Sequence, residues 1–185
     1  MSDSSQPAGD RIEPLLTAGA IAGRVGRLGR DLTAFYADRQ PLTVLGVMTG
    51  GLVFCGDLIR KIEQPLQLGV IHARSYHGRS TTSGELSLAA DMLPPIEDRH
   101  VLLVDDIFDS GRTLSRIVDE LASRQPASIE SVVLLNKQVE RAAEATTQPT
   151  WSGFEIADEF VVGYGLDFDG EHRNLPAIGV LKRGE

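Results

Sequence analysis

The segment from Val101 to Leu114, VLLVDDIFDSGRTL, constrains the fold more than any other part of the chain. Its first four residues predict a buried strand, because a short continuous apolar run is typical of strands covered on both faces. Acidic and small residues follow, and apolar residues then recur at helical spacing over Thr113–Ser123. The succession of strand, loop and helix is the repeating unit of α/β folds, in which the sheet is mainly parallel.

The same alternation extends along most of the chain. Apolar residues at helical spacing predict a helix from about Glu13 to Asp38, and a second helix is predicted over Leu52–Ile62. Further strands are predicted at Leu42–Met48, Leu66–Tyr76, Glu85–Ala90, Ile129–Leu135, Phe154–Ile156, Phe160–Tyr164 and Ile178–Leu181. We therefore expect an α/β protein with a mainly parallel, twisted sheet flanked by helices.

Length and charge limit the classes of function. The chain has 185 residues, of which 42% are hydrophobic, so one domain can bury a core without disulfides or metal. Residues 1 to about 10 are polar and predict a disordered tail, which leaves a single domain over residues 11–185. The net charge of −8 argues against nucleic acid or an anionic membrane surface as a partner, because both require a basic face.

The cysteine content indicates the compartment. Cys55 is the only cysteine, which excludes an internal disulfide framework and favours a reducing environment. No apolar run approaches the roughly 20 residues of a membrane-spanning helix, and the polar N-terminus is unlike a secretory signal. We therefore expect a cytoplasmic protein.

The residues after the predicted strand Val101–Val104 carry the clearest chemical signal. Asp105 and Asp106 stand where the strand is expected to end, which is where ligands bind in open parallel sheets. Asp109-Ser110-Gly111-Arg112-Thr113 then precedes a helix, whose free N–H groups favour an anion. Carboxylates beside such a loop indicate a sugar-phosphate pocket. In an alternative interpretation, Asp109 and Ser110 only cap the helix.

Four segments carry a resemblance to a known family. The strand, the acidic pair and the loop at 109–113 resemble the phosphoribosyl-pyrophosphate signature of the type I phosphoribosyltransferases. Ser75-Tyr76 before a polar loop is similar to the catalytic loop of their 6-oxopurine branch. Phe160–Asp167, followed by Arg173–Pro176, resembles the purine-binding end of the hypoxanthine-guanine phosphoribosyltransferases.

This resemblance covers about Leu42 to Leu181 and implies a fold and an activity. The fold would be the type I phosphoribosyltransferase fold, with a core over about 40–140 and a small hood from about 11–39 and 150–185. The activity would transfer the 5-phosphoribosyl group from 5-phosphoribosyl 1-pyrophosphate to hypoxanthine or guanine, with Mg²⁺ as cofactor. Relatives of this kind are commonly homodimers or homotetramers.

The resemblance also implies roles for individual residues. Asp105 and Asp106 would meet the ribose hydroxyls, directly or through Mg²⁺, and Asp167 would bind a second Mg²⁺. The 5′-phosphate and pyrophosphate would be held by Ser110, Gly111, Arg112, Thr113, Thr49, Gly50 and Arg173. Ser75 and Tyr76 would close over the reacting centre.

The base would be read by a second set of residues. Asp109 would be the catalytic proton acceptor at the purine ring, and Lys137 would donate to the 6-oxo group. Phe160 would stack on the purine, and the Val161 main chain would read the ring edge. Asp167 would also take part in purine binding. Two departures from the family stand out, since many members have Lys or Arg at Thr49 and Pro at Ala157.

Two other functions share parts of the pattern. VLLVDD also resembles the acidic strand end of a receiver domain, but there the acidic pair follows the first strand, whereas here it lies mid-chain. A phosphoribosyltransferase-fold regulator that senses nucleotides or binds nucleic acid without catalysis is the second alternative. The net charge of −8 argues against nucleic-acid binding by such a regulator.

Overall fold

Five parallel strands form the centre of the molecule. The computed structural model describes residues 10–72 and 93–184, so the expected tail and the predicted strand Glu85–Ala90 lie outside the described residues. The large sheet has the order β3-β2-β4-β5-β6, and each neighbouring pair is parallel. Its strands are β2 (Leu42–Met48), β3 (Leu66–His72), β4 (His100–Phe108), β5 (Ser128–Lys137) and β6 (Trp151–Ile156).

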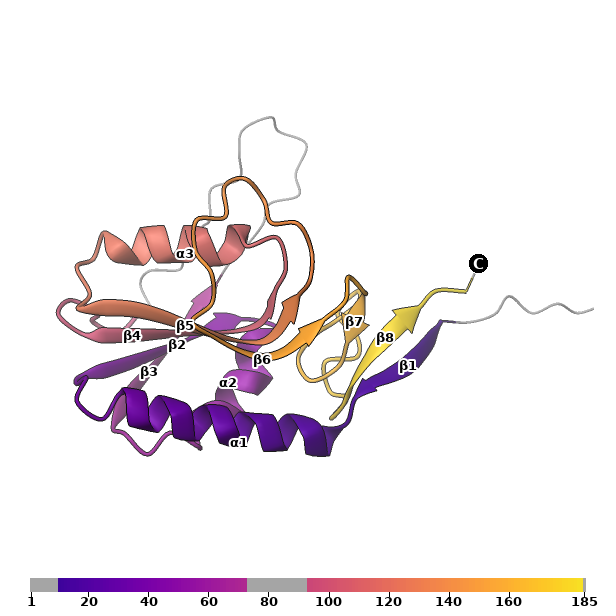
Figure 1. Cartoon of the computed structure of the whole chain (residues 1–185), viewed down its shortest axis with the longest axis horizontal. Helices are drawn as coiled ribbons and strands as arrows, with labels where there is room; N and C mark the ends of the chain where they lie inside the picture. The colour runs from indigo at the N-terminus through magenta and orange to yellow at the C-terminus, as the bar shows by residue number, and fades with distance from the viewer. Residues whose placement is uncertain (1–9, 73–92, 185) are drawn as a thin grey trace, which may run out of the picture.

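Helices cover both faces of this sheet. α1 (Ala18–Phe35) and α2 (Gly51–Ile59) lie on one face, and α3 (Arg112–Ala122) lies on the other (Figure 1). A hydrophobic core lies on each face of the sheet, and alternate residues of β4 pack into one or the other. Leu102 packs on the α1 and α2 side, and Leu103 packs on the α3 side. This explains why the strand is apolar without interruption. In the described part of the chain, no helix is long and apolar enough to cross a membrane.

A second, smaller sheet corrects the prediction for the N-terminal segment. Residues from Glu13 were expected to be helical, but β1 (Arg11–Leu16) is a strand that pairs antiparallel with β8 (Ile178–Lys182). Pro14 is tolerated because β1 is an edge strand. α1 begins only after Thr17, whose Oγ1 accepts a hydrogen bond from the Ala20 N–H at 3.2 Å.

The small sheet has the order β1-β8-β7, where β7 is only Val161–Val162. The predicted strand Phe160–Tyr164 is shorter than expected because Gly163 and Tyr164 both adopt positive φ, of 100° and 52°. Parts of both segments expected to form a hood contribute to this sheet, which lies beyond one end of the large sheet (Figure 1). α1 and β6, by contrast, pack with the large sheet.

Cys55 lies inside the core of α2 and β2. Its side chain is buried, and burial raises the pKa of its thiol to about 11. Gly46 on β2 leaves room for it, since a Cβ there would lie 3.0 Å from the Cys55 Sγ. This agrees with the interpretation of Cys55 as a small buried residue, because only the thiolate is nucleophilic.

Candidate functional site

The acidic pair lies at the carboxyl end of the central strand β4. The sequence places Asp105 and Asp106 just beyond a strand ending at Val104, but β4 continues to Phe108, because Ile107 and Phe108 still pair with β5. Asp105 Oδ1 accepts from the Asp106 N–H at 2.9 Å, and Asp106 Oδ1 accepts from the Ile107 N–H at 2.8 Å. Main-chain donors therefore hold both carboxylates in place.

Both carboxylates are poorly solvated. Burial, reinforced by the negative charge of Asp106, raises the pKa of Asp105 well above its usual range. Burial likewise raises the pKa of Asp106, while hydrogen bonds with Asp105 and Ile107 and, to a smaller extent, the nearby Arg173 charge oppose that shift. Two neighbouring carboxylates in this setting favour a cation or hydroxyl groups as ligands.

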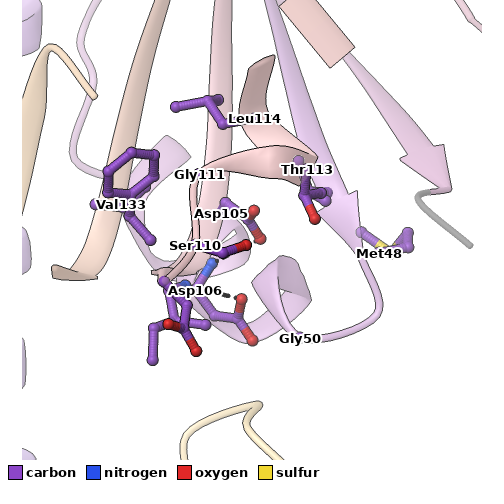
Figure 2. Close-up of a pocket in the computed structure, with 13 residues that line it drawn as sticks. Met48, Gly50, Asp105, Asp106, Ser110, Gly111, Thr113, Leu114 and Val133 are labelled. Carbon is purple, nitrogen blue, oxygen red and sulfur yellow. Dashed lines mark hydrogen bonds between the residues drawn. The ribbon is translucent and has the colours of Figure 1, made fainter. Parts of the chain in front are cut away.

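The loop after β4 completes a pocket at this end of the sheet (Figure 2). A cavity of about 230 Å³ is bordered by Gly50, Asp105, Asp106, Asp109, Ser110, Gly111 and Thr113, together with apolar neighbours. Gly111 precedes α3 with φ +81°, and a Cβ there would approach the Ala145 Cβ to 2.7 Å. The loop therefore needs glycine at this position to turn the first N–H groups of α3 toward the pocket.

The β2–α2 loop forms the opposite wall. A Cβ on Gly50 would lie 1.7 Å from Asp106 Oδ2, so the glycine allows the carboxylate to reach the loop backbone. Gly165, at φ +102°, lies against the Gly50 carbonyl in the same way. Thr49 is exposed, and its carbonyl accepts from the Leu52 N–H at 3.2 Å. The segment thus offers main chain, rather than a long side chain, to a ligand.

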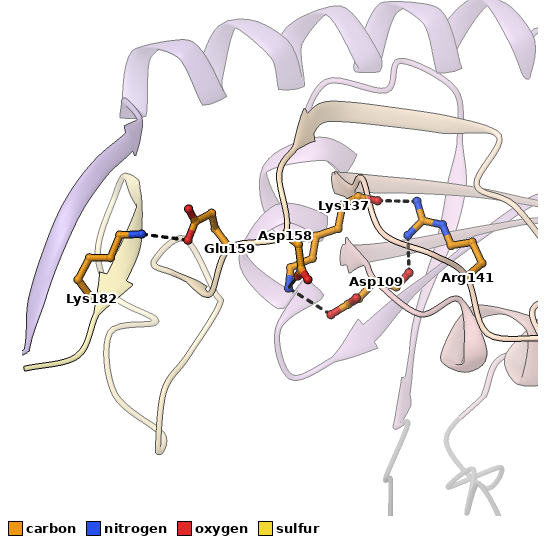
Figure 3. Close-up of polar contacts among 6 residues, drawn as sticks. All are labelled: Asp109, Lys137, Arg141, Asp158, Glu159 and Lys182. Carbon is orange, nitrogen blue, oxygen red and sulfur yellow. Dashed lines mark hydrogen bonds and ion pairs between the residues drawn. The ribbon is translucent and has the colours of Figure 1, made fainter. Parts of the chain in front are cut away.

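Lys137 connects Asp109 of the pocket to Asp158, which follows β6. It ends β5 with its side chain only 11% exposed, and its Nζ lies 3.3 Å from both Asp109 Oδ2 and Asp158 Oδ1 (Figure 3). The parallel pairing of β4 and β5 brings the two strand ends to the same edge of the sheet. An acceptor and a donor therefore stand side by side at the rim of the cavity.

An aromatic side chain lies close to Asp158 in the sequence. Phe160 is 51% exposed, and its ring meets Phe168 edge to face with centroids 5.7 Å apart. The Arg183 guanidinium lies 4.5 Å from the Phe168 ring centroid. Val161 is buried and pairs with Val180, so its main chain is held by the small sheet.

Asp167 and Arg173 form a salt bridge of 2.7 Å in the loop between β7 and β8. Arg173 also donates to the Gly165 carbonyl at 2.6 Å, which ties this loop to the wall made by Gly50. Arg173, Tyr164 and Pro176 further border a separate, largely apolar cavity. Asp167 and Arg173 therefore satisfy each other's charge in this conformation.

Some predicted site residues do not meet the others. The Arg112 side chain lies 3.4 Å from Glu144 and does not border the cavity, so only its main chain is available to the loop. Ser75 and Tyr76 lie outside the described residues.

Two residues at the site were missed by the sequence analysis. Asp158 could have been noticed as a carboxylate beside Phe160. Arg141 could not, because its bonds go mainly to main-chain carbonyls, which leave no trace in the sequence.

Comparisons with known proteins identify the family to which the chain belongs. Residues 13–169 match the family model described as the phosphoribosyl transferase domain. The chain is 38% identical over 170 residues to a hypoxanthine phosphoribosyltransferase of Haemophilus influenzae, covering 91% of this chain and 94% of the relative. It is 41% identical over 168 residues to the hypoxanthine-guanine phosphoribosyltransferase of Bacillus subtilis, covering 91% and 92%.

Solved structures give the same result. The crystal structure of a hypoxanthine phosphoribosyltransferase from Staphylococcus aureus matches with a TM-score of 0.84 at 40% identity, over 92% of this chain and 91% of that one. The expected α/β fold with a parallel sheet is confirmed. The receiver-domain interpretation is therefore not supported.

Proposed function

Because the chain belongs to the phosphoribosyl transferase domain family and, within it, to the hypoxanthine phosphoribosyltransferases, we propose that it is a purine salvage enzyme. It transfers the 5-phosphoribosyl group from 5-phosphoribosyl 1-pyrophosphate to hypoxanthine or guanine, giving IMP or GMP and pyrophosphate. The observation that carries this proposal is the junction of the acidic pocket at β4 with the Asp109–Lys137 pair.

The acidic side of the pocket would bind the phosphoribosyl group. Asp105 and Asp106 are acceptors for the ribose hydroxyls. The loop Ser110–Thr113 presents N–H groups and hydroxyls to the 5′-phosphate, since the first N–H groups of a helix have no partner within the helix. The Thr49-Gly50 main chain would contact the pyrophosphate.

Mg²⁺ is the proposed cofactor, and the donor set fits it. Buried neighbouring carboxylates are stabilised by a cation, and their hard oxygen atoms suit Mg²⁺. Within residues 10–72 and 93–184, no group of three or more His, Cys, Asp or Glu side chains surrounds one point. The protein would thus supply part of the coordination, with water and phosphate oxygens completing it. When bound, the ion would neutralise charge on the departing pyrophosphate.

The base side would supply proton transfer and recognition. The bond between ribose C1′ and the pyrophosphate oxygen breaks, a bond from C1′ to a purine nitrogen forms, and the purine ring proton passes to Asp109. Lys137 donates a hydrogen bond to the 6-oxo group of the purine. A 6-amino group is itself a donor and cannot accept this hydrogen bond. Phe160 stacks on the ring and the Val161 main chain reads its edge.

The remaining proposed contacts complete the site. Asp167 would bind a second Mg²⁺ and Arg173 would contact pyrophosphate, each from the salt bridge that the two side chains form in the structure. Ser75 and Tyr76, which lie outside the described residues, would close over the reacting centre. Closure matters because an oxocarbenium-like centre must be protected from water.

The setting of the enzyme is also part of the proposal. We place it in the cytoplasm, on the basis of its single buried cysteine. By analogy with the family, a homodimer or homotetramer is proposed, which light scattering would measure. The alternative of a non-catalytic regulator is not favoured, because the matched relatives are named as enzymes.

The deciding experiment mixes purified protein with 5-phosphoribosyl 1-pyrophosphate, Mg²⁺ and, separately, hypoxanthine, guanine, xanthine and adenine. Nucleotide formation is followed by absorbance. Turnover with one or more 6-oxopurines but not adenine supports the proposal. If the sugar pyrophosphate binds but no base reacts, the enzymatic proposal fails and the regulator becomes the better interpretation.

A further inference from the structure

The segment after β5, to which the sequence analysis assigned no role, lies over the loop between β4 and α3. The Ala142 N–H donates to the Ser110 carbonyl at 3.0 Å. The Thr146 and Thr147 N–H groups donate to the buried Ser115 Oγ at 3.0 and 3.1 Å. The segment is therefore attached to the proposed phosphate loop and to the first turn of α3.

Arg141 makes the central contacts of this segment (Figure 3). Its Nη1 donates to the Asp109 carbonyl, and its Nη2 donates to the Lys137 carbonyl at 2.6 Å and to Asn136 Oδ1 at 2.7 Å. The guanidinium also lies 4.4 Å from the centroid of the Phe108 ring. One side chain thus connects the loop after β4 to the end of β5.

The two carbonyls that Arg141 holds belong to the two residues that would bind the base. Asp109 Oδ2 and Lys137 Nζ are 3.3 Å apart, a separation that suits a neighbouring donor and acceptor on one purine edge. Their strands end at the same edge of the sheet, but Asp109 lies beyond the last paired residue of β4. A contact outside the sheet is therefore needed to fix one residue relative to the other.

Resting on the proposed function, we propose that Arg141 is a positioning residue for base recognition, which holds Asp109 and Lys137 in register. The guanidinium suits this role because its planar fork donates several hydrogen bonds in fixed directions and can stack on an aromatic ring. Lysine carries the same charge without the fork, so charge alone does not reproduce the contacts.

The test compares Arg141→Ala and Arg141→Lys with a matched control, Arg39→Ala. Arg39 also donates to a carbonyl, that of Phe35, and lies 4.0 Å from the Phe35 ring centroid, but it follows α1, away from the pocket. We expect Arg141→Ala to lower kcat/KM for hypoxanthine by about 10- to 100-fold, since small misplacements of reacting groups cost this much. KM for 5-phosphoribosyl 1-pyrophosphate should stay within about twofold, and Arg141→Lys should recover only part of the loss.

A binding measurement separates this inference from the proposed reaction. Calorimetry gives Kd for inosine monophosphate and for ribose 5-phosphate, and their ratio isolates the contribution of the base. We expect Arg141→Ala to weaken the binding of inosine monophosphate but not that of ribose 5-phosphate. Arg39→Ala should change the Kd of neither ligand. Equal weakening of both ligands, or an unchanged ratio, overturns the role of Arg141. Failure of the unaltered protein to form nucleotide would instead contradict the proposed reaction. The ratio of the two Kd values would still test the role of Arg141.

Discussion

The two sides of the pocket are built from different kinds of contact. On the proposed sugar-phosphate side, Asp105 and Asp106 are consecutive residues of a buried strand and bond to main-chain N–H groups. On the proposed base side, Lys137 ends one strand, whereas Asp158 and Phe160 follow another. Lys137 is held there by two carboxylate side chains, of which that of Asp158 is 70% exposed.

Because of this difference, we expect one side of the pocket to be rigid and the other to adjust to its ligand. Main-chain bonds within a buried strand move only if the strand moves, so the sugar-phosphate side is held in one geometry. Ion pairs with an exposed partner are weaker and can be exchanged for contacts to a ligand. Changes on the base side should therefore alter which purine is accepted, while changes on the acidic side should alter binding of the common substrate or stability.

Asp109 stands where the two sides meet, and its loss should have the largest effect. We expect Asp109→Asn to lower kcat by about 10²–10⁴-fold, because the amide cannot take the ring proton. Binding of 5-phosphoribosyl 1-pyrophosphate should be nearly unchanged. Steady-state kinetics and calorimetry would measure both, with Asp119→Asn on the exposed face of α3 as the control. An unchanged kcat would remove Asp109 from the mechanism.

Lys137 tests whether the base side alone sets specificity. We expect Lys137→Ala to reduce the preference for hypoxanthine over adenine by about 10- to 100-fold in kcat/KM, the value of a hydrogen bond to a charged group. Asp158→Asn, which removes only the charge of the more exposed of the two partners of Lys137, should change this ratio by less than about fivefold. Parallel assays with both bases measure the ratio. Undiminished discrimination in Lys137→Ala would assign this role to another residue.

A substitution at Asp105 tests the sugar-phosphate side through the thermal stability of the protein, and we expect its effect to be the smallest of the three. Because its pKa in the folded protein is raised above the unfolded value of about 3.9, the folded state binds more protons, and stability falls as pH rises through that interval. In EDTA at pH 7, Asp105→Asn should therefore raise Tm. The rise should be about 2–4 °C for each kcal/mol gained in the free energy of unfolding. The gain should shrink toward pH 4, where the carboxyl is protonated. Differential scanning calorimetry at both pH values measures it, and a lower Tm at pH 7 would contradict the burial argument.

Much of the fold was predictable from local patterns. The strands β2 and β5 and the helices α2 and α3 lie within a few residues of their predicted positions, because apolar periodicity reports burial directly. The N-terminal strand β1 was missed, since its conformation comes from pairing with β8 at the other end of the chain. Such a pairing has no local signal, and the apolar spacing around Leu15 and Leu16 fits a helix equally well.

The sequence by itself determined the acidic half of the site. Asp105 through Thr113 are joined by a single strand, loop and helix, so their proximity follows from chain connectivity. Only the tertiary structure decided how Lys137 and Arg141 meet Asp109 and how Asp158 meets Lys137, because these residues come from separate segments. The physical reason is that Arg141 bonds mainly to main-chain carbonyls, which every residue carries, so its position is specified by the packing of strands rather than by any pattern of side chains.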